Sequence, residues 1–187
     1  MRNKIIILNI MVTLALVIGI TAVSHYVNQY QIKNDTTHIQ SRLNDWLNRG
    51  NNSNVNPHVL QVIQLDKSTT YIALFQIENE IVGYAELIKG FNHKLKLKSS
   101  SYGPNISYKD IKTNKGIYGV LVGKNSNLQI DHISTSLSEQ DYSFISTVVN
   151  EKQFVKYEKL PQHLSKTYPA VITLYDEKNN LLINPEL

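Results

Sequence analysis

The sequence predicts a mainly β protein, an antiparallel meander forming a sheet, sandwich or barrel-like body, with an N-terminal transmembrane helix and a short amphipathic helix. Residues 5–24 are apolar and uncharged, and from Val59 onward apolar residues recur with a period of two between turn residues. We therefore divide the chain into residues 1–24, a cytoplasmic stub with a transmembrane helix or signal anchor; residues 25–57, a juxtamembrane helix and polar linker; and residues 58–187, an extracytoplasmic β-rich domain.

The first segment is long enough to cross a membrane. Ile5 to Ser24 contains no charge and, at helical rise, covers a hydrocarbon core of roughly 30 Å. Arg2 and Lys4 precede it, so the positive-inside rule puts the N-terminus in the cytoplasm and the rest of this single-pass protein outside the cell membrane. The alternative is a signal peptide cleaved after Ser24, because Ala22 and Ser24 are the small residues that a signal peptidase requires. Both interpretations export the same domain.

Composition limits the classes of function. A chain of 187 residues is long enough for one domain with a proper core after the span. From His25 onward 17 basic residues face 15 acidic ones, so the near-neutral domain predicts no nucleic-acid partner. The absence of cysteine excludes disulfides, thiolate metal sites and cysteine nucleophiles.

A short amphipathic helix follows the span. Asp35 to Thr37 is a plausible N-cap, Gly50 is placed to end the helix, and its apolar stripe has helical spacing, at Ile39, Leu43, Trp46 and Leu47. Packing on the following domain is one interpretation of this stripe. The other is a stalk that continues the membrane helix and meets a partner.

Alternating and β-branched runs predict a series of strands, at Val59–Leu65, Tyr71–Ile77, Ile81–Ile88, His93–Ser99, Tyr108–Lys112, Ile117–Gly123, Leu128–Ile133, Tyr142–Val149, Phe154–Tyr157, Ala170–Tyr175 and Leu181–Asn184. The runs Tyr71–Phe75 and Ile117–Val122 are apolar on both faces, so we expect them to be covered on both sides. His93–Lys98 alternates and should have one face in water. The pattern leaves open whether the tail extends the first sheet or builds a second layer.

Lysines concentrate in the middle of the chain. Between Lys89 and Lys124 there are eight lysines and one acidic residue, Asp110. We expect those of one strand to share a face at a spacing of about 6 to 7 Å. The candidate anion-binding face, for a lipid headgroup layer, an anionic envelope polymer or an acidic protein, consists of Lys94, Lys96, Lys98, Lys109 and Lys112. The alternative is that lysines on an exposed or edge strand only prevent aggregation.

The sequence predicts no catalytic residue, cofactor or metal site. The six histidines lack metal-ligand spacing, and there is no nucleophile elbow or glycine-rich phosphate loop. Asp131 and His132 are the only adjacent acid and imidazole, and in a strand they would point to opposite faces. Tyr71, Tyr84, Tyr118 and Tyr175 are expected in the core, whereas Tyr102 is the tyrosine expected in an exposed loop.

The central stretch resembles a known group of proteins. The succession of residues 89–92, 102–103, 113–116 and 123–125 resembles small, single-span, membrane-anchored proteins of Gram-positive bacteria with no assigned activity. The resemblance covers residues 71–133 and implies a membrane location and a β-meander fold, with no site residue to carry over.

Three hypotheses of function follow. The first is a membrane-anchored, extracytoplasmic, non-catalytic module that binds an envelope protein or anionic envelope polymer. The second is an accessory subunit of a membrane complex that acts through its span and juxtamembrane helix. The third, an envelope hydrolase, would require a concave polar pocket.

Overall fold

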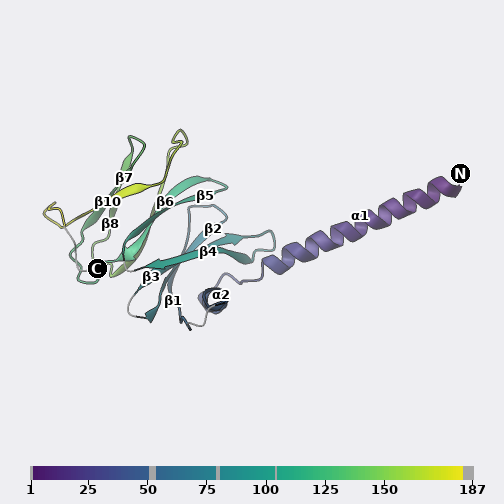
Figure 1. Cartoon of the computed structure of the whole chain (residues 1–187), viewed down its shortest axis with the longest axis horizontal. Helices are drawn as coiled ribbons and strands as arrows, with labels where there is room; N and C mark the ends of the chain where they lie inside the picture. The colour runs from purple at the N-terminus through teal and green to yellow at the C-terminus, as the bar shows by residue number, and fades with distance from the viewer. Residues whose placement is uncertain (1, 51–53, 79–80, 104, 183–187) are drawn as a thin grey trace.

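The computed structural model describes residues 2–50, 54–78, 81–103 and 105–182, with side chains from Asn9 onward (Figure 1). Helices and strands follow in the order α1 (Arg2–Gln29), α2 (Thr36–Asn48), β1 (His58–Gln64), β2 (Thr70–Gln76), β3 (Val82–Lys89), β4 (Leu95–Gly103), β5 (Ser107–Thr113), β6 (Gly116–Lys124), β7 (His132–Leu137), β8 (Ser143–Thr147), β9 (Gln153–Lys159) and β10 (Ala170–Tyr175). The predicted mainly β fold with a long apolar N-terminal helix and a short second helix is confirmed.

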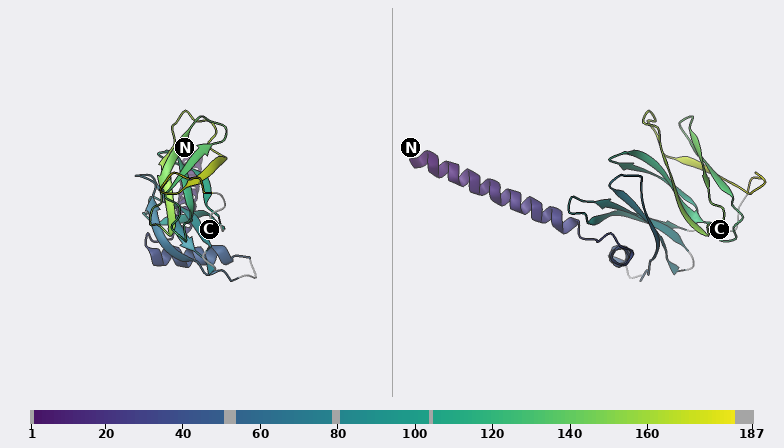
Figure 2. Two further views of the ribbon diagram at one scale, coloured as in Figure 1. Left: turned by 90° about the vertical axis from the view of Figure 1, so that its left-hand side faces the viewer. Right: turned by 180° about the vertical axis from the view of Figure 1, so that it is seen from behind.

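The first helix projects away from the β body (Figure 1 and the right view of Figure 2). At 28 residues, α1 is about 42 Å long. Its residues from Asn9 to His25 are all exposed although the stretch is rich in leucine, isoleucine and valine. The helix is long and apolar enough to cross a bilayer, as a membrane anchor or a signal sequence would be.

The second helix lies against the first sheet. The carboxylate of Asp35 caps it by accepting a hydrogen bond from the His38 N–H at 2.9 Å. Ile39 and Leu43 on its apolar stripe are fully buried, which confirms that the stripe packs on the domain. Gly50 follows the helix with φ +75°, a conformation that glycine adopts without strain.

The strands form three antiparallel sheets, with the orders β1-β2-β3-β4, β5-β6-β9 and β10-β7-β8. The first sheet is a simple meander. The sequence left open whether the tail extends the first sheet or builds another layer. In the structure, β7, β8 and β10 form the third sheet, and β9 pairs with β6 in the second sheet.

The molecule is built in layers, with α2, the first sheet, the second sheet and the third sheet stacked in that order. Three buried clusters join neighbouring layers. The cluster under α2 includes Phe75 and Leu87, the cluster between the first two sheets includes Ile72 and Val120, and the third cluster includes Phe154. Burial of apolar side chains between the layers therefore holds the sheets together.

Strands β2 and β6 are covered on both faces, as predicted. In β2, Phe75 faces α2 while Leu74 faces the second sheet, and in β6, Val120 and Leu121 belong to different clusters. A Cβ at Gly119 would lie 2.9 Å from the Tyr108 ring of the neighbouring strand β5 and 3.2 Å from the Phe144 ring of the third sheet, so this central strand needs a glycine here.

Two strand predictions fail in the tail. Leu128 to Asp131 is an irregular segment that begins with Leu128 at φ +56°, and the strand begins only at His132. The cause is the fully buried Asn125, whose side chain donates to Ile130 O and accepts from Ile130 N–H. The last predicted strand is reduced to a single bridge at Leu181, and its final residues lie outside the described part of the chain.

Candidate functional site

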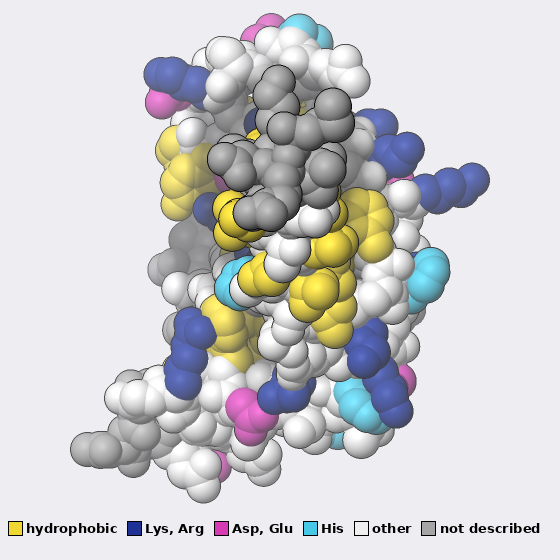
Figure 3. All heavy atoms as spheres, turned by 90° about the vertical axis from the view of Figure 1, so that its right-hand side faces the viewer, with side chains coloured by type: hydrophobic (Ala, Val, Ile, Leu, Met, Phe, Trp, Pro, Cys, Tyr) yellow, Lys and Arg dark blue, Asp and Glu magenta, His cyan; other side chains and the backbone are white. Residues whose placement is uncertain are grey.

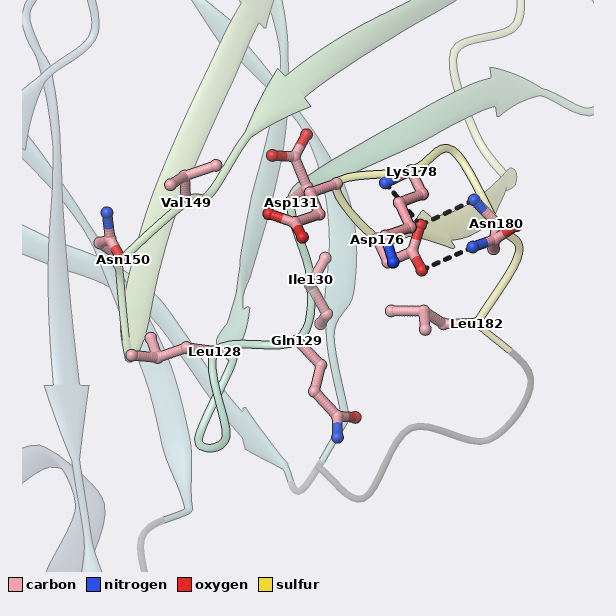
Figure 4. Close-up of a pocket in the computed structure, with 11 residues that line it drawn as sticks. Leu128, Gln129, Ile130, Asp131, Val149, Asn150, Asp176, Lys178, Asn180 and Leu182 are labelled. Atoms are coloured by element: carbon pink, nitrogen blue, oxygen red, sulfur yellow. Dashed lines mark hydrogen bonds between the residues drawn. The ribbon is translucent and has the colours of Figure 1, made fainter.

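A cavity of about 650 Å³ is lined by connecting loops (Figure 4), and these loops lie at the end of the body farthest from α1 (Figure 1). Three connecting segments contribute to it: the segment before β7, the turn between β8 and β9, and the turn after β10. The lining residues are Leu128, Gln129, Ile130, Asp131, Val149, Asn150, Asp176, Glu177, Lys178, Asn180 and Leu182. The cavity is thus made from loops that the sheets position, a common arrangement for binding sites.

Local backbone conformations shape these loops. Leu128, Asn150 and Asn179 have φ of +56°, +60° and +62°, so each of the three segments turns through the left-handed region. Asparagine tolerates this region well, whereas leucine does so at a cost. The buried Asn125 amide beneath the first segment supplies the hydrogen bonds that hold Leu128 there.

Asp176 organises the turn after β10. Its carboxylate accepts hydrogen bonds from Lys178 N–H at 2.9 Å, from Asn180 N–H at 2.8 Å and from Asn180 Nδ2 at 2.9 Å (Figure 4). The Asn180 side chain, followed by its backbone N–H, lowers the pKa of Asp176 below 3.8. This carboxylate is therefore ionised and engaged by its own loop.

Asp131 and His132 form a couple that was not expected. His132 Nδ1 lies 2.8 Å from Asp131 Oδ2, and the imidazole stacks on the Tyr175 ring with centroids 5.0 Å apart. The prediction that the two side chains point apart is wrong because Asp131 precedes the strand, which begins at His132. The sequence shows an acid next to an imidazole, which is the signal for such a couple, but the predicted strand included both residues.

The cavity combines carboxylates with apolar walls. Glu177 and Asp131 bring negative charge, Lys178 brings one positive charge, and Leu128 and Val149 are 42% and 43% exposed beside them. Such a surface suits a ligand that carries a cationic group next to an apolar one. Among the described residues, no group of three histidine, aspartate or glutamate side chains is placed to hold a metal ion.

No family model, curated protein or solved structure matches this chain. The site must therefore be interpreted from its own residues.

The three lysines around β4 have different surroundings. Lys94 precedes β4, and its backbone helps to close the β3–β4 turn. Lys96 Nζ donates to Gln29 Oε1 at 2.9 Å, at the end of α1. Lys98 lies at a bulge, and its Nζ is 2.8 Å from the carboxylate of Glu86. The sequence pattern did not single out Glu86, which is only 6% exposed and makes Lys98 a structural residue.

The other two lysines lie on the second sheet. Lys109 and Lys112 are both exposed on β5, and Lys109 Nζ lies 3.9 Å from Asp110 and 5.4 Å from the centre of the Tyr168 ring. The five lysines are thus divided between two sheets. Anion binding by them stays a prediction.

Tyrosines mostly fill the core, as expected. Tyr71, Tyr84 and Tyr118 are buried, whereas Tyr175 is only partly buried and stacks on His132. Tyr102 is 45% exposed but lies within β4, so the prediction of a loop at this residue is wrong. Burial, together with a 2.7 Å hydrogen bond from its hydroxyl to Asp66, raises the pKa of Tyr118 to about 12. The Tyr118 hydroxyl is therefore structural and stays protonated in the physiological range.

Proposed function

We propose that this protein is a membrane-anchored, extracytoplasmic, non-catalytic binding module. One observation carries the proposal: an exposed apolar helix lies at one end of the layered body, and the loops that line the cavity lie at the other end. With α1 in the bilayer, the cavity faces away from the membrane. Arg2 and Lys4 support a cytoplasmic N-terminus, so this face would meet other components of the envelope.

The chemistry of the distal cavity supports a basic peptide segment of an envelope protein as its ligand. The carboxylates of Asp131 and Glu177 would meet the cationic group, and Leu128 and Val149 the neighbouring apolar atoms. Lys178 favours a ligand that also presents a carbonyl or carboxylate oxygen.

Single engineered cysteines test the membrane topology, because the natural chain has none. In intact cells, an impermeant maleimide should label Ser138→Cys, an exposed position, and should not label Asn3→Cys until the membrane is opened. The protein should stay in the membrane pellet after alkaline extraction. Labelling of Asn3→Cys alone would invert the topology, and a shortened chain released from the pellet would identify a cleaved signal peptide.

Crosslinking in native membranes tests the binding site. Glu177→Lys should abolish capture of a specific envelope protein, whereas Glu158→Lys, the same charge change at an exposed β9 position outside the cavity, should not. If both variants retain the partner, the cavity is not the binding site.

A second candidate is an accessory subunit whose span is the interface. It is favoured by the exposure of α1 and by hydrogen bonds that tie the end of this helix to the β body. Replacing residues 5–24 with an unrelated span would remove the function of a subunit and preserve that of a binding module.

The third hypothesis, a hydrolase, is favoured by the polar cavity and by the Asp131–His132 couple. Turnover by the full chain that His132→Ala abolishes would replace the binding proposal.

A further inference from the structure

The turn between β3 and β4, residues 90–94, lies against the end of α1. Phe91 N–H donates to Tyr26 Oη at 2.7 Å, and Asn92 Nδ2 donates to Tyr30 O at 2.9 Å. The Tyr26 and Tyr30 rings stack with centroids 4.6 Å apart, and the Phe91 ring continues the stack 5.8 Å from Tyr26. Aromatic rings and hydrogen bonds therefore join segments that are 65 residues apart in sequence.

A glycine permits this contact. A Cβ at Gly90 would lie 2.6 Å from Tyr26 Oη and 2.7 Å from Tyr30 Cδ1, closer than side-chain atoms can approach. The turn itself is closed by a hydrogen bond from Gly90 N–H to Lys94 O at 2.8 Å, with His93 at φ +61°. The turn is thus closed by its own hydrogen bond, and its contacts with Tyr26 and Tyr30 orient it relative to α1.

Phe91 is held out from the body by this turn. Its side chain is 92% exposed, more than any other large apolar side chain described. The predicted span ends at Ser24, and Tyr26 follows it by about 3 Å along the helix axis. At that level of a membrane protein, aromatic rings lie at the boundary between headgroups and hydrocarbon. A bilayer around α1 would therefore reach the ring of Phe91.

The surroundings of the turn are basic. From Lys89 to Lys98 there are four lysines and no acidic residue. Lys96 also lines a groove of about 310 Å³ beside the end of α1, together with Arg42 and Arg49. The acidic residue of this groove, Asp45, lies 3.7 Å from Arg42.

Viewed from the N-terminal end of α1, Lys and Arg side chains lie on several sides of the helix (Figure 3). This arrangement complements the negative charge of anionic lipid headgroups.

We propose that the β3–β4 turn enters the bilayer that α1 crosses, with the Phe91 ring at the headgroup boundary and the surrounding basic side chains on anionic headgroups. The inference rests on the proposed function, because it requires α1 to span a membrane. The turn then acts as a second membrane contact, which sets the orientation of the domain.

Tryptophan fluorescence of the full chain in vesicles tests the contact. The only natural tryptophan is removed by Trp46→Phe, and three reporters are added singly: Phe91→Trp, Leu16→Trp in the span, and Tyr102→Trp as the matched aromatic control. Tyr102 is seven residues beyond Leu95, about 23 Å along β4 from the turn. The vesicles contain phosphatidylcholine and phosphatidylglycerol with bromine on the acyl chains, near the headgroup or near the chain end.

The expected result is that bromine near the headgroup removes most of the Phe91→Trp emission and leaves the Tyr102→Trp emission unchanged. Leu16→Trp should be quenched by bromine near the chain end, and its failure to be quenched would reject the membrane span itself. If Leu16→Trp is quenched while Phe91→Trp is not, the proposed contact is rejected. Iodide in the aqueous phase then shows whether the rejected turn lies in water, where iodide quenches it, or against another protein, where it does not.

Discussion

The two ends of the molecule are built on different principles. At the end near α1, Tyr26 and Phe91 join segments far apart in sequence, and the side chains around them are mainly basic. At the distal end, the Asp176 and Asn125 side chains hold their own loops, backbone hydrogen bonds join Asp131 to Tyr175 and to Val148, and the cavity carries carboxylates. Aromatic stacking and hydrogen bonds fix the anchor on the body, whereas the distal loops combine side-chain contacts within each loop with backbone contacts between loops.

The difference matters for function because the two ends would bind different partners. An end coupled rigidly to a helix transmits the position of that helix. An end made of connecting loops on rigid sheets can vary the side chains that it exposes while the sheets stay in place, which suits a surface that recognises a ligand.

The layers between the two ends provide the most severe test. Val120→Asp would bury an unpaired charge between the first two sheets, at a cost of several kcal/mol against a total stability of about 5–15 kcal/mol. The β body should unfold at both ends together, and circular dichroism of the full chain in detergent would show the loss of β structure. Val171→Asp, at a β10 position that is 57% exposed, is the matched control and should fold. A soluble, cooperatively unfolding Val120→Asp protein would refute the central position of β6, and Leu74→Asp tests β2 in the same way.

Detaching the turn from α1 should affect the membrane-proximal end alone. Gly90→Ala places a methyl group within 2.6 Å of Tyr26 Oη, and overpacking of this kind costs about 1–3 kcal/mol. Hydrogen exchange of the Phe91 amide should accelerate, while exchange at Asn180 stays unchanged. Gly103→Ala is the control, because a Cβ there meets nothing within 4 Å. Equal exchange at Phe91 in both variants would contradict the coupling.

The lysines around β4 should differ in how much they contribute to the free energy of unfolding. Lys98→Gln removes the cation paired with the buried Glu86 carboxylate and should lower the free energy of unfolding by about 1–2 kcal/mol, since solvent partly screens this half-exposed lysine. Lys94→Gln should change it by less than about 0.5 kcal/mol. Denaturant titration of both variants measures the difference, and equal effects would remove the structural role of Lys98.

Each end also contains an aspartate with a lowered pKa, Asp35 through the His38 N–H and Asp176 chiefly through Asn180. Because the pKa in the folded state lies below the unfolded value of 3.8, each stabilises the fold above pH 3.8, and the contribution is lost as the pH falls through the lowered pKa. Carbon NMR of the two carboxyl groups should give midpoints below 3.8. A midpoint at or above 3.8 for Asp176 would mean that the turn is open in solution.

The sequence predicted what depends on periodicity. Burial of β2 and β6 on both faces followed from unbroken apolar runs, and the start of α2 followed from the capping chemistry of Asp35. The distal cavity was not predicted, because it depends on the buried amide of Asn125 and on positive φ at Leu128, neither of which alternation reveals.

The membrane-proximal contact was also not predicted. Tyr26 and Tyr30 are spaced i, i+4 at the end of an apolar run, which predicts that they share a helix face. Their partner at Phe91 is a residue of a β-turn, and its distance along the chain gives no sign of proximity. Only the contact between the end of α1 and the β3–β4 turn brings the three rings together.

The clamp between Gly90 and the two tyrosines has a mechanical consequence. A helix whose apolar length exceeds the thickness of the bilayer relieves the mismatch by tilting. In the anchored protein that we propose, the turn would convert this tilt into rotation of the whole β body, because Phe91 is bonded to the helix end. The thickness of the surrounding membrane would thereby set how high above the lipid surface the distal cavity stands, and which neighbours it can reach.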